Sequence, residues 1–474
     1  MKKTVKLFFL FLISASGLLS CTDNDDVTQY STYQIQNFIW KGLNAYYLYQ
    51  PQITDLSDAR FSNQQQLDGY LANFSDPNDL FENLILDREN TDKYSVLFSN
   101  YIALEQILSG TTKNNGVEYG LTYKSGSTTD IFGYVKYILP NSDASTKAIQ
   151  RGTIFYAVNG TPLTISNYRS LLGSDSYTLN FADYDSGNIT PNGQSVALTK
   201  TAFSENPVLI KKVIPVGAKK VGYLVYNGFY GEYETELNAA FAYFKSENVT
   251  DLVLDLRYNG GGSIDTANRL GTMITGQFSG QIYAQQQWNP KIQPRLNPNE
   301  SINIFETTTR NGAAINSLNL SKVYILTTRN TASASELVIN CLDPYINVVQ
   351  IGTTTTGKNV GSITMYDSPT FRKENVNPNH TYAMQPIVLK IVNKNGFGDY
   401  TQGISPDASN VLAENLSNLG ELGNPTEPLL SKALGLAGLR ISSQNNVFKI
   451  HNEIIDTSVR DLTSEMYLEN TLKK

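Results

Sequence analysis

Histidine and cysteine are nearly absent from this chain of 474 residues, which has two of each. Catalytic and structural metal sites usually need clusters of these side chains at short spacing. His380, His451 and Cys341 are too scattered to form such a cluster, so no metal and no other cofactor is expected. A lone Cys341 in the mature part of the chain also excludes an intrachain disulfide there.

Charge is sparse as well. Charged residues make up 17% of the chain, and the formal net charge is −6. An acidic balance argues against a nucleic acid as the main partner. Hydrophobic residues at 41% are sufficient for a large core, and the length fits roughly three domains. No internal repeat or coiled coil is visible, so we expect a multidomain globular protein.

The first 20 residues have the pattern of a signal peptide. Three lysines precede an apolar run from Leu7 to Leu19, which is too short for an ordinary membrane span. The run ends at Ser20-Cys21, which resembles a bacterial lipobox. The resemblance implies cleavage before Cys21, lipidation of its thiol, and a polar tether over residues 21–32. We expect a lipoprotein in the cell envelope of a Gram-negative-like bacterium, on either face of the outer membrane; the alternative is a plain signal peptide with an incidental Cys21.

Hydrophobic periodicity divides the remaining chain into four parts. Apolar residues recur at helical spacing over residues 33–112, which predicts a small helical domain. Alternation over residues 113–205 predicts a β-rich domain. Strands and helices alternate over residues 206–437, which predicts an α/β domain, with an irregular insertion at 284–319. The tail, residues 438–474, shows no informative pattern.

The β-rich region has a recognisable order of elements. Strands flank a short helical segment, and the Asn159-Gly160 pair indicates a hairpin turn. This order resembles a PDZ domain of the bacterial protease type. The resemblance implies that a loop containing Gly120 and Leu121 binds the terminal carboxylate of a peptide, which adds to the domain as a strand.

Two residues of possible chemical function follow strands of the α/β region. Ser333 lies between a predicted strand and a predicted helix, where a side chain can be presented beside a helix N-terminus. Ser333 and Glu336 also fit a helix-capping box, which is a far commoner use of this pattern. Lys358 follows 25 residues later (358 − 333 = 25). Each feature is weak when it is taken alone.

The surrounding motifs strengthen the interpretation. The segment from Asp255 to Gly262 reads Asp-Leu-Arg-Tyr-Asn-Gly-Gly-Gly, and residues 403–407 read Gly-Ile-Ser-Pro-Asp. With Ser333 and Lys358 in this order, the chain resembles the tail-specific, or C-terminal processing, serine peptidases. The resemblance implies an α/β catalytic domain of the crotonase/ClpP-like type and a Ser-Lys dyad.

The resemblance also assigns the individual roles. Ser333 is the nucleophile, and Lys358 accepts its proton, for which the site must lower the lysine pKa from about 10.4 by on the order of 3 units. The oxyanion of the tetrahedral intermediate is stabilised by backbone N–H groups of Gly261 or Gly262 and of Ala334. Asp255 and Arg257 are expected to support the turn without touching the substrate.

Several positions depart from the family pattern. Relatives often carry Gln four residues after the lysine, where this chain has Ser362, and an acidic residue where it has Pro344. Asp343 and Ser362 are therefore the candidates for orienting Lys358. The function expected is a membrane-anchored serine endopeptidase that recognises protein C-termini. The alternatives are a catalytically inactive peptide-binding lipoprotein of the same fold, and a Ser-His-Asp hydrolase that uses His380 or His451 as its base.

Overall fold

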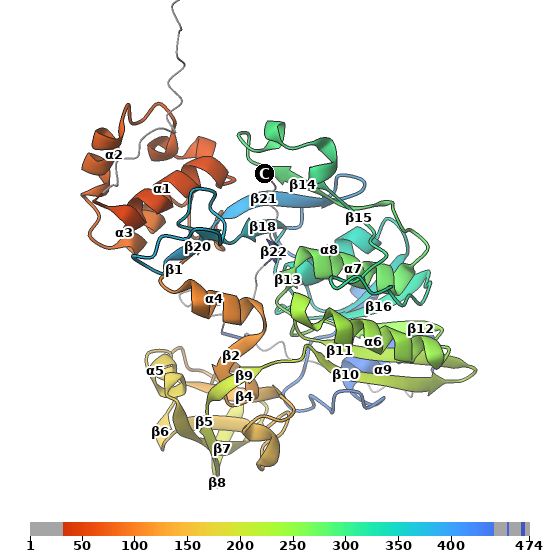
Figure 1. Ribbon diagram of the computed structural model, residues 1–474. Coiled ribbons are helices and arrows are strands. Elements are labelled where there is room, and N and C mark those ends of the chain that lie inside the picture. Colours follow the sequence, from red (N-terminus) through yellow and green to blue (C-terminus); the bar gives the residue numbers. More distant parts are fainter. Residues whose placement is uncertain (1–31, 440–452, 455–465, 470–474) are drawn as a thin grey trace, which may run out of the picture.

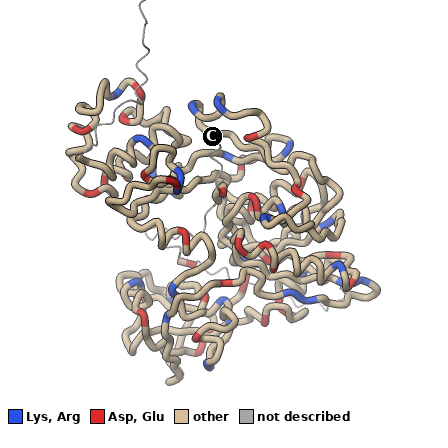
Figure 2. The backbone as a smooth tube through the Cα atoms, viewed as in Figure 1, with Lys and Arg blue, Asp and Glu red and all other residues tan. Residues whose placement is uncertain are grey.

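The structure, a computed structural model, describes residues 32–439, 453–454 and 466–469 (Figure 1). The expected signal peptide, Cys21, the tether and His451 lie outside the described residues. Within the described residues, no helix combines the length and the apolar composition needed to cross a membrane. Figure 2 shows the positions of Lys and Arg residues interspersed with those of Asp and Glu along the described chain.

The N-terminal region is helical, as its periodicity predicts. Its helices are α1 (Gln34–Tyr46), α2 (Gln64–Leu71), α3 (Pro77–Asn83) and α4 (Tyr101–Leu108). Side chains of Asn63, Asp76 and Asn100 accept backbone N–H groups at the starts of α2, α3 and α4, which stabilises these helix ends.

This helical region does not fold on a core of its own. Its strand β1 (Val96–Phe98) pairs with β20 (Ala383–Gln385), which also pairs with β19 (Met365–Tyr366). The buried Phe38 and Leu43 belong to the same hydrophobic cluster as Met365 and Met384. Residues 33–112 are thus continuous in packing with the α/β domain.

The β-rich domain has a six-stranded sheet. Its strands are β3 (Val117–Tyr123), β4 (Ile131–Ile138), β5 (Ile154–Val158), β6 (Thr161–Pro162), β7 (Ser176–Asp185) and β8 (Asn188–Thr199), with helix α5 (Tyr168–Gly173). A separate two-stranded sheet of β2 (Thr111–Asn114) and β9 (Thr201–Ser204) lies where this domain joins the others. Its main hydrophobic cluster, which includes Phe155 and Leu179, is distinct from that of the α/β domain.

A five-stranded sheet forms the centre of the α/β domain. In spatial order its strands are β10 (Val208–Val216), β11 (Lys219–Tyr226), β12 (Asp251–Asp255), β16 (Lys322–Thr327) and β17 (Asn347–Gly352). β10 and β11 are antiparallel, and the strands from β11 to β17 are parallel. The carboxyl ends of β12, β16 and β17 therefore lie side by side, where sites form in parallel sheets.

Helices cover both faces of this sheet. On one face lie α6 (Glu234–Ser246), α7 (Ile264–Thr275) and α8 (Ala334–Leu342), and on the other lies α9 (Pro428–Ala437). Successive side chains of a strand point to opposite faces of the sheet, so each strand can pack against the helices on both faces. In β12, Leu252 and Leu254 belong to the cluster with α6, whereas Val253 belongs to the cluster with α9.

A second sheet adjoins the first and differs most from the sequence predictions. Its order is β13 (Gly262–Ser263), β22 (Met466–Leu468), β18 (Val360–Ile363), β21 (Ile387–Asn393), β14 (Ile282–Trp288) and β15 (Ile302–Ile304). The supposedly irregular insertion thus contributes β14 and β15, and the tail contributes β22. The hydrophobic pattern of residues 383–392 predicts a single strand, but the structure divides it into β20 and β21 at Pro386, which lacks the N–H needed to continue a ladder.

Candidate active site

Ser333 occupies a strained turn between β16 and α8. Its side chain is 0% exposed, and its backbone has φ +64° and ψ −116°. A non-glycine residue in this region costs on the order of 1–3 kcal/mol, and such strain clusters at functional sites. The local pattern is that of a capping box, yet the Ser333 Oγ has no hydrogen-bond partner within the described part of the chain. The hydroxyl is thus held in place but left available.

Glu336 joins the serine to the lysine loop. One carboxylate oxygen, Oε2, accepts the backbone N–H groups of Ser333 at 2.7 Å and Lys358 at 2.9 Å. The other, Oε1, accepts the Thr355 hydroxyl at 2.5 Å and the Gly357 N–H at 2.6 Å. Burial raises the pKa of this carboxyl, and the four donors act in the opposite direction. One buried side chain therefore fixes the spacing of the two loops.

Lys358 follows β17 in a compact loop. The loop is held from its other side by Ile404, whose N–H donates to the Thr355 Oγ1 at 2.7 Å and whose C=O accepts the Thr355 N–H at 3.1 Å. Gly357 has φ +99°, and a Cβ there would lie 2.4 Å from the Thr401 carbonyl oxygen, so the turn requires glycine. The Lys358 side chain is 0% exposed, and its Nζ lies 4.6 Å from the centre of the Tyr94 ring.

The glycine turn follows β12. The Asn259 Oδ1 accepts the Gly261 N–H at 2.9 Å, so this group is engaged inside the turn. Gly262 has φ +135°, and a Cβ there would lie 2.4 Å from the Phe229 oxygen. Phe229 donates its N–H to the Gly261 carbonyl at 2.8 Å and accepts the Ser263 N–H at 2.9 Å. The N–H and C=O of Gly262 therefore face away from Phe229, toward its paired strand β22.

The second predicted oxyanion donor is the first residue of α8. Ala334 has no carbonyl within its own helix to which its N–H could donate. The turn and α8 are tied together, because Ala332 donates its N–H to the Asn259 carbonyl at 3.1 Å and the Ser335 hydroxyl donates to it at 3.0 Å. The candidate donors and the candidate nucleophile thus belong to one connected unit.

Arg257 anchors the glycine turn, as predicted for a supporting residue. Its guanidinium is 1% exposed and donates to Asp255 at 2.9 Å, to Glu427 at 2.7 Å and to Glu414 at 3.1 Å. A buried charge is tolerated only with such compensation. These three partners of the guanidinium lie outside the turn before Ser333, and only the Arg257 backbone carbonyl contacts that turn, by accepting the Thr328 hydroxyl.

The same network reaches the β-rich domain. Arg151, which precedes β5, donates to the Tyr258 hydroxyl at 2.6 Å and to the Glu414 carboxylate at 2.7 Å. Burial alone would raise the pKa of Glu414, but the Arg151 and Arg257 guanidiniums lower it to about 2. Tyr258 precedes the glycine turn directly, so the turn is linked through one side chain to the β-rich domain.

Two family models match this chain. The model of peptidase family S41 matches residues 220–408, and the model of the peptidase S41 N-terminal domain matches residues 34–96. Both matches lie in parts of the chain that contribute to the arrangement around Ser333 and Lys358. The chain belongs to peptidase family S41.

Known proteins support the membership. A C-terminal processing peptidase from the chloroplast of Tetradesmus obliquus is 24% identical over 272 residues, which is 55% of this chain and 54% of that protein. The chain thus matches about half the length of this curated relative. A crystal structure of a candidate S41 protease from Bacteroides fragilis NCTC 9343 aligns with a TM-score of 0.66 and 27% identity, covering 84% of this chain and 96% of that one.

Gly120 and Leu121 do not form the loop predicted from the PDZ resemblance. Both lie inside strand β3, paired with Tyr134 and Gly133 of β4. The Leu121 carbonyl accepts the N–H of Ile454 at 2.8 Å on the other edge of the strand. Because successive peptide groups of a strand face opposite edges, the Leu121 N–H faces this outer edge and the Gly120 N–H faces β4.

The two candidates for orienting Lys358 are placed differently. Asp343 is exposed at the C-terminal end of α8, whereas Ser333 lies at the N-terminal end. A helix rises 1.5 Å per residue, so Asp343 is more than roughly 10 Å from the serine, and this placement argues against it. Ser362 is buried in β18, and its hydroxyl donates to the Met466 carbonyl at 3.3 Å.

His380 is engaged elsewhere. Its Nε2 lies 2.8 Å from the Asp367 carboxylate, and its Nδ1 accepts the Tyr382 N–H at 3.1 Å. Both ring nitrogens are therefore occupied. The ring lies against Phe38 of α1, which argues against a Ser-His-Asp site built from this histidine.

Glu336 and Tyr94 are the site residues whose position the sequence did not reveal. Glu336 was visible only as part of a capping box, because a local pattern does not show the Lys358 loop that lies 22 residues away. Tyr94 comes from the N-terminal region, in a segment with no motif. Its neighbour Asp92 holds that segment by accepting the Ser95 hydroxyl at 2.5 Å.

Proposed function

We propose that this S41 protein is a serine endopeptidase in which Ser333 is the nucleophile and Lys358 the general base. The observation that carries the proposal is the Glu336 carboxylate, which binds the backbone of both residues at once. Strain at Ser333, its unpartnered hydroxyl and the burial of both side chains support the same assignment.

The reaction follows the usual order of acyl transfer. The Ser333 Oγ attacks the substrate carbonyl carbon as its proton passes to the neutral Lys358 amine. The oxyanion receives hydrogen bonds from the Ala334 N–H and from a glycine of the turn. Gly262 is favoured because Asn259 holds the Gly261 N–H inside the turn, whereas the partner of Gly262 is the three-residue strand β22. The lysine then protonates the leaving amine, and a water hydrolyses the acyl-enzyme by the same route.

Substrate recognition is proposed to involve the β-rich domain. Its meander of strands with α5 is PDZ-like, and the outer edge of β3, where residues 453–454 lie, is the edge to which a peptide strand can add. The Leu121 N–H is the candidate for binding the terminal carboxylate. The link from Arg151 to Tyr258 gives this domain a direct contact with the glycine turn.

The location proposed is the outer membrane, with Cys21 lipidated after removal of residues 1–20. The short apolar run before the cysteine supports this proposal. A protein anchored in this way would act on substrates of the cell envelope.

The competing function is peptide binding without catalysis, suggested by the departures from the family pattern at Pro344 and Ser362. The test is to incubate the protein with unfolded proteins that differ only in a free or amidated C-terminus, and to identify cleavage sites by mass spectrometry. We expect cleavage by the wild type, none by Ser333→Ala, and wild-type cleavage by Ser417→Ala, which changes an exposed serine. An amide end should raise the apparent KM about tenfold. Binding without any cleavage would support the competing function.

A further inference from the structure

The C-terminal segment of this chain contacts both proposed substrate-binding regions. Two short stretches of it are described, residues 453–454 and 466–469. The first lies against the β-rich domain, and the second lies within the α/β domain. Their contacts show how an extended peptide fits each surface.

The first contact is strand addition to β3. The Ile454 N–H donates to the Leu121 carbonyl at 2.8 Å, and Glu453 forms an antiparallel bridge with Thr122. The Glu453 carboxylate accepts Lys136 Nζ at 2.6 Å from β4 and Asn330 Nδ2 at 2.8 Å from the turn before Ser333. A peptide on this edge is therefore in contact with both domains.

The second contact is strand β22. It lies between β13 and β18 and is parallel to both, with Met466 opposite Gly262 and Tyr467 opposite Ser263 and Ser362. Met466 and Leu468 are buried in the main core. The intervening Tyr467 donates its hydroxyl to the Leu108 carbonyl at 3.1 Å.

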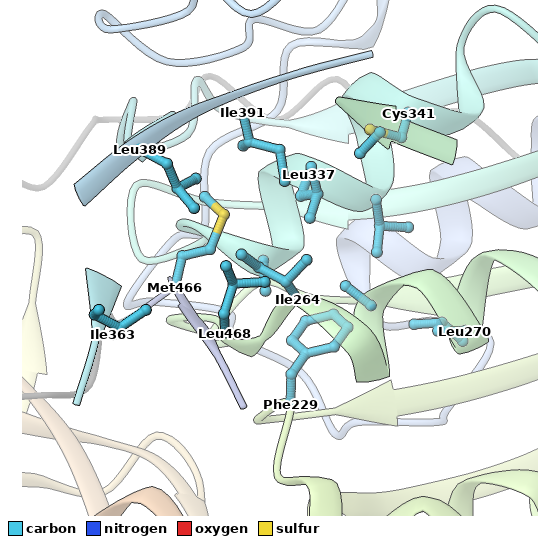
Figure 3. Close-up of a cluster of buried hydrophobic side chains, with 14 of the residues drawn as sticks. Phe229, Ile264, Leu270, Leu337, Cys341, Ile363, Leu389, Ile391, Met466 and Leu468 are labelled. Carbon is cyan, nitrogen blue, oxygen red and sulfur yellow. The ribbon is translucent and has the colours of Figure 1, made fainter. Parts of the chain in front are cut away.

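This strand passes beside the proposed catalytic groups. Gly262, which it pairs with, is the favoured oxyanion glycine, and Ser362 belongs to the strand that follows Lys358. Figure 3 shows Met466 and Leu468 close to Ile264 of α7, with Leu337 of α8 and Leu389 of β21 on the other side of Met466. Leu337 lies in the turn of α8 that begins at Ser333.

The C-terminal segment runs in the opposite direction to a substrate that could be cleaved. A substrate whose C-terminus is bound on β3 would place residues that precede this C-terminus at Ser333. In this segment the residues on β3, 453–454, precede those beside the glycine turn, 466–468. The segment thus covers both surfaces but runs in reverse.

We propose that the gap between β13 and β18 is a peptide site that selects apolar side chains at two alternate positions, and that residues 466–468 are its resident occupant, which a substrate must displace. The proposal deepens the proposed function and rests on it. Met466 and Leu468 belong to the main core and define the selected side chains, whereas the intervening Tyr467, which is also buried, lies outside this cluster and contacts Leu108. A strand of three residues beside partners of two and four residues is short enough to open locally without unfolding the domain.

Hydrogen exchange with the full-length Ser333→Ala protein tests displacement without catalysis. The probe is the peptide Ser-Glu-Met-Tyr-Leu-Glu, and the control replaces its Met and Leu by Asp. We expect the first peptide at saturation to speed exchange of the 466–468 amides at least tenfold, without changing exchange in β16, and the control to have no effect. If hydrogen exchange of the 466–468 amides does not change at saturating peptide, or if both peptides have the same effect, β22 is a permanent strand and the proposal is wrong.

A kinetic measurement separates this inference from the proposed function. Glu453→Ala removes the contacts to Lys136 and Asn330 without opening the core, and we expect it to raise kcat/KM for a short peptide about threefold to tenfold. The exposed Glu421→Ala is the matched control. An unchanged kcat/KM for Glu453→Ala in an active enzyme would contradict displacement. If the wild-type protein cleaves no substrate but the peptide still speeds hydrogen exchange of residues 466–468, the proposed catalysis is refuted and the proposed displacement is not.

Discussion

The Glu336 carboxylate accepts the backbone N–H of Lys358 at 2.9 Å, although the two residues are 22 positions apart in sequence. The same oxygen accepts the Ser333 N–H. Hydrogen bonds to a charged acceptor in a buried site are stronger than neutral ones and are costly to break. The relative position of the proposed nucleophile and base therefore depends on this one side chain.

Replacement of Glu336 by Gln should reduce catalysis with little change in substrate affinity. Each carboxylate oxygen accepts two donors, so an amide must turn its NH2 group toward one of these pairs and face N–H or O–H groups. We expect kcat to fall about 10-fold to 100-fold, with KM within about twofold, in steady-state assays.

Thr355→Val is the matched control for this variant. It removes one donor to the carboxylate and the acceptor of the Ile404 N–H, but it does not place two donors against each other. We expect kcat to fall less than about fivefold. If Glu336→Gln kept the wild-type kcat, the carboxylate would not be setting the geometry of the dyad.

Replacing either member of the dyad should abolish proteolysis. Ser333→Ala and Lys358→Ala are expected to lower the rate at least about 10³-fold, because no acyl-enzyme or no proton acceptor remains. Lys358→Arg should fail equally, since a guanidinium stays protonated. Peptide cleavage, with circular dichroism to verify folding, measures these effects.

Lys390→Ala and His380→Ala serve as controls for the dyad and should stay within a few fold of the wild type. A folded Lys358→Ala protein that kept its activity, together with an inactive His380→Ala protein, would replace the Ser-Lys assignment by a histidine-dependent one.

The α/β elements were largely predictable because their signals are local. The periodicity predicts a helix over residues 264–275, and α7 has these bounds, since the Ser263 hydroxyl accepts the Thr266 N–H at its start and Gly276, with φ +70°, stops it. The apolar runs at 221–226 and 323–327 predict strands, which match β11 and β16 within two residues.

What the sequence did not reveal depends on tertiary contacts. β22 has three residues, and its place between β13 and β18 is set by partners far away in the chain. β14 is rich in Gln at positions where a strand usually carries apolar side chains, so its pattern is weak. Ser333 and Lys358 were predicted from spacing and family resemblance, whereas the role of Glu336 needed the folded loops.

The anchor can be tested independently of catalysis. Cys21→Ala should abolish labelling by a fatty-acid probe and move the protein from the membrane fraction to the soluble fraction, because the lipidated thiol is lost. Cys341→Ala is the matched control, since this thiol is buried in the core, and its labelling should not change. Labelling and fractionation that are unaffected by Cys21→Ala would refute the lipoprotein proposal.

Glu205 should make stability depend on pH. It lies between β9 and β10, where burial and the Glu118 carboxylate raise its pKa from 4.5 to about 8, while the Asn227 amide acts in the opposite direction. Between these two values the folded state binds more protons than the unfolded state, so this carboxyl lowers the free energy of unfolding as pH rises through that window. Glu205→Gln removes the titration.

We therefore expect Glu205→Gln to leave Tm unchanged at pH 4 and to raise it by a few degrees at pH 8.5, measured by calorimetry. Glu118→Gln should produce a smaller increase in the same direction, because it removes only the charge that faces Glu205. Glu374 is exposed, and the control variant Glu374→Gln should leave Tm unchanged at both pH values. A gain in Tm for Glu205→Gln that is equal at both pH values would mean that the carboxyl does not titrate in this window, and that the amide stabilises the junction by its hydrogen bonds instead.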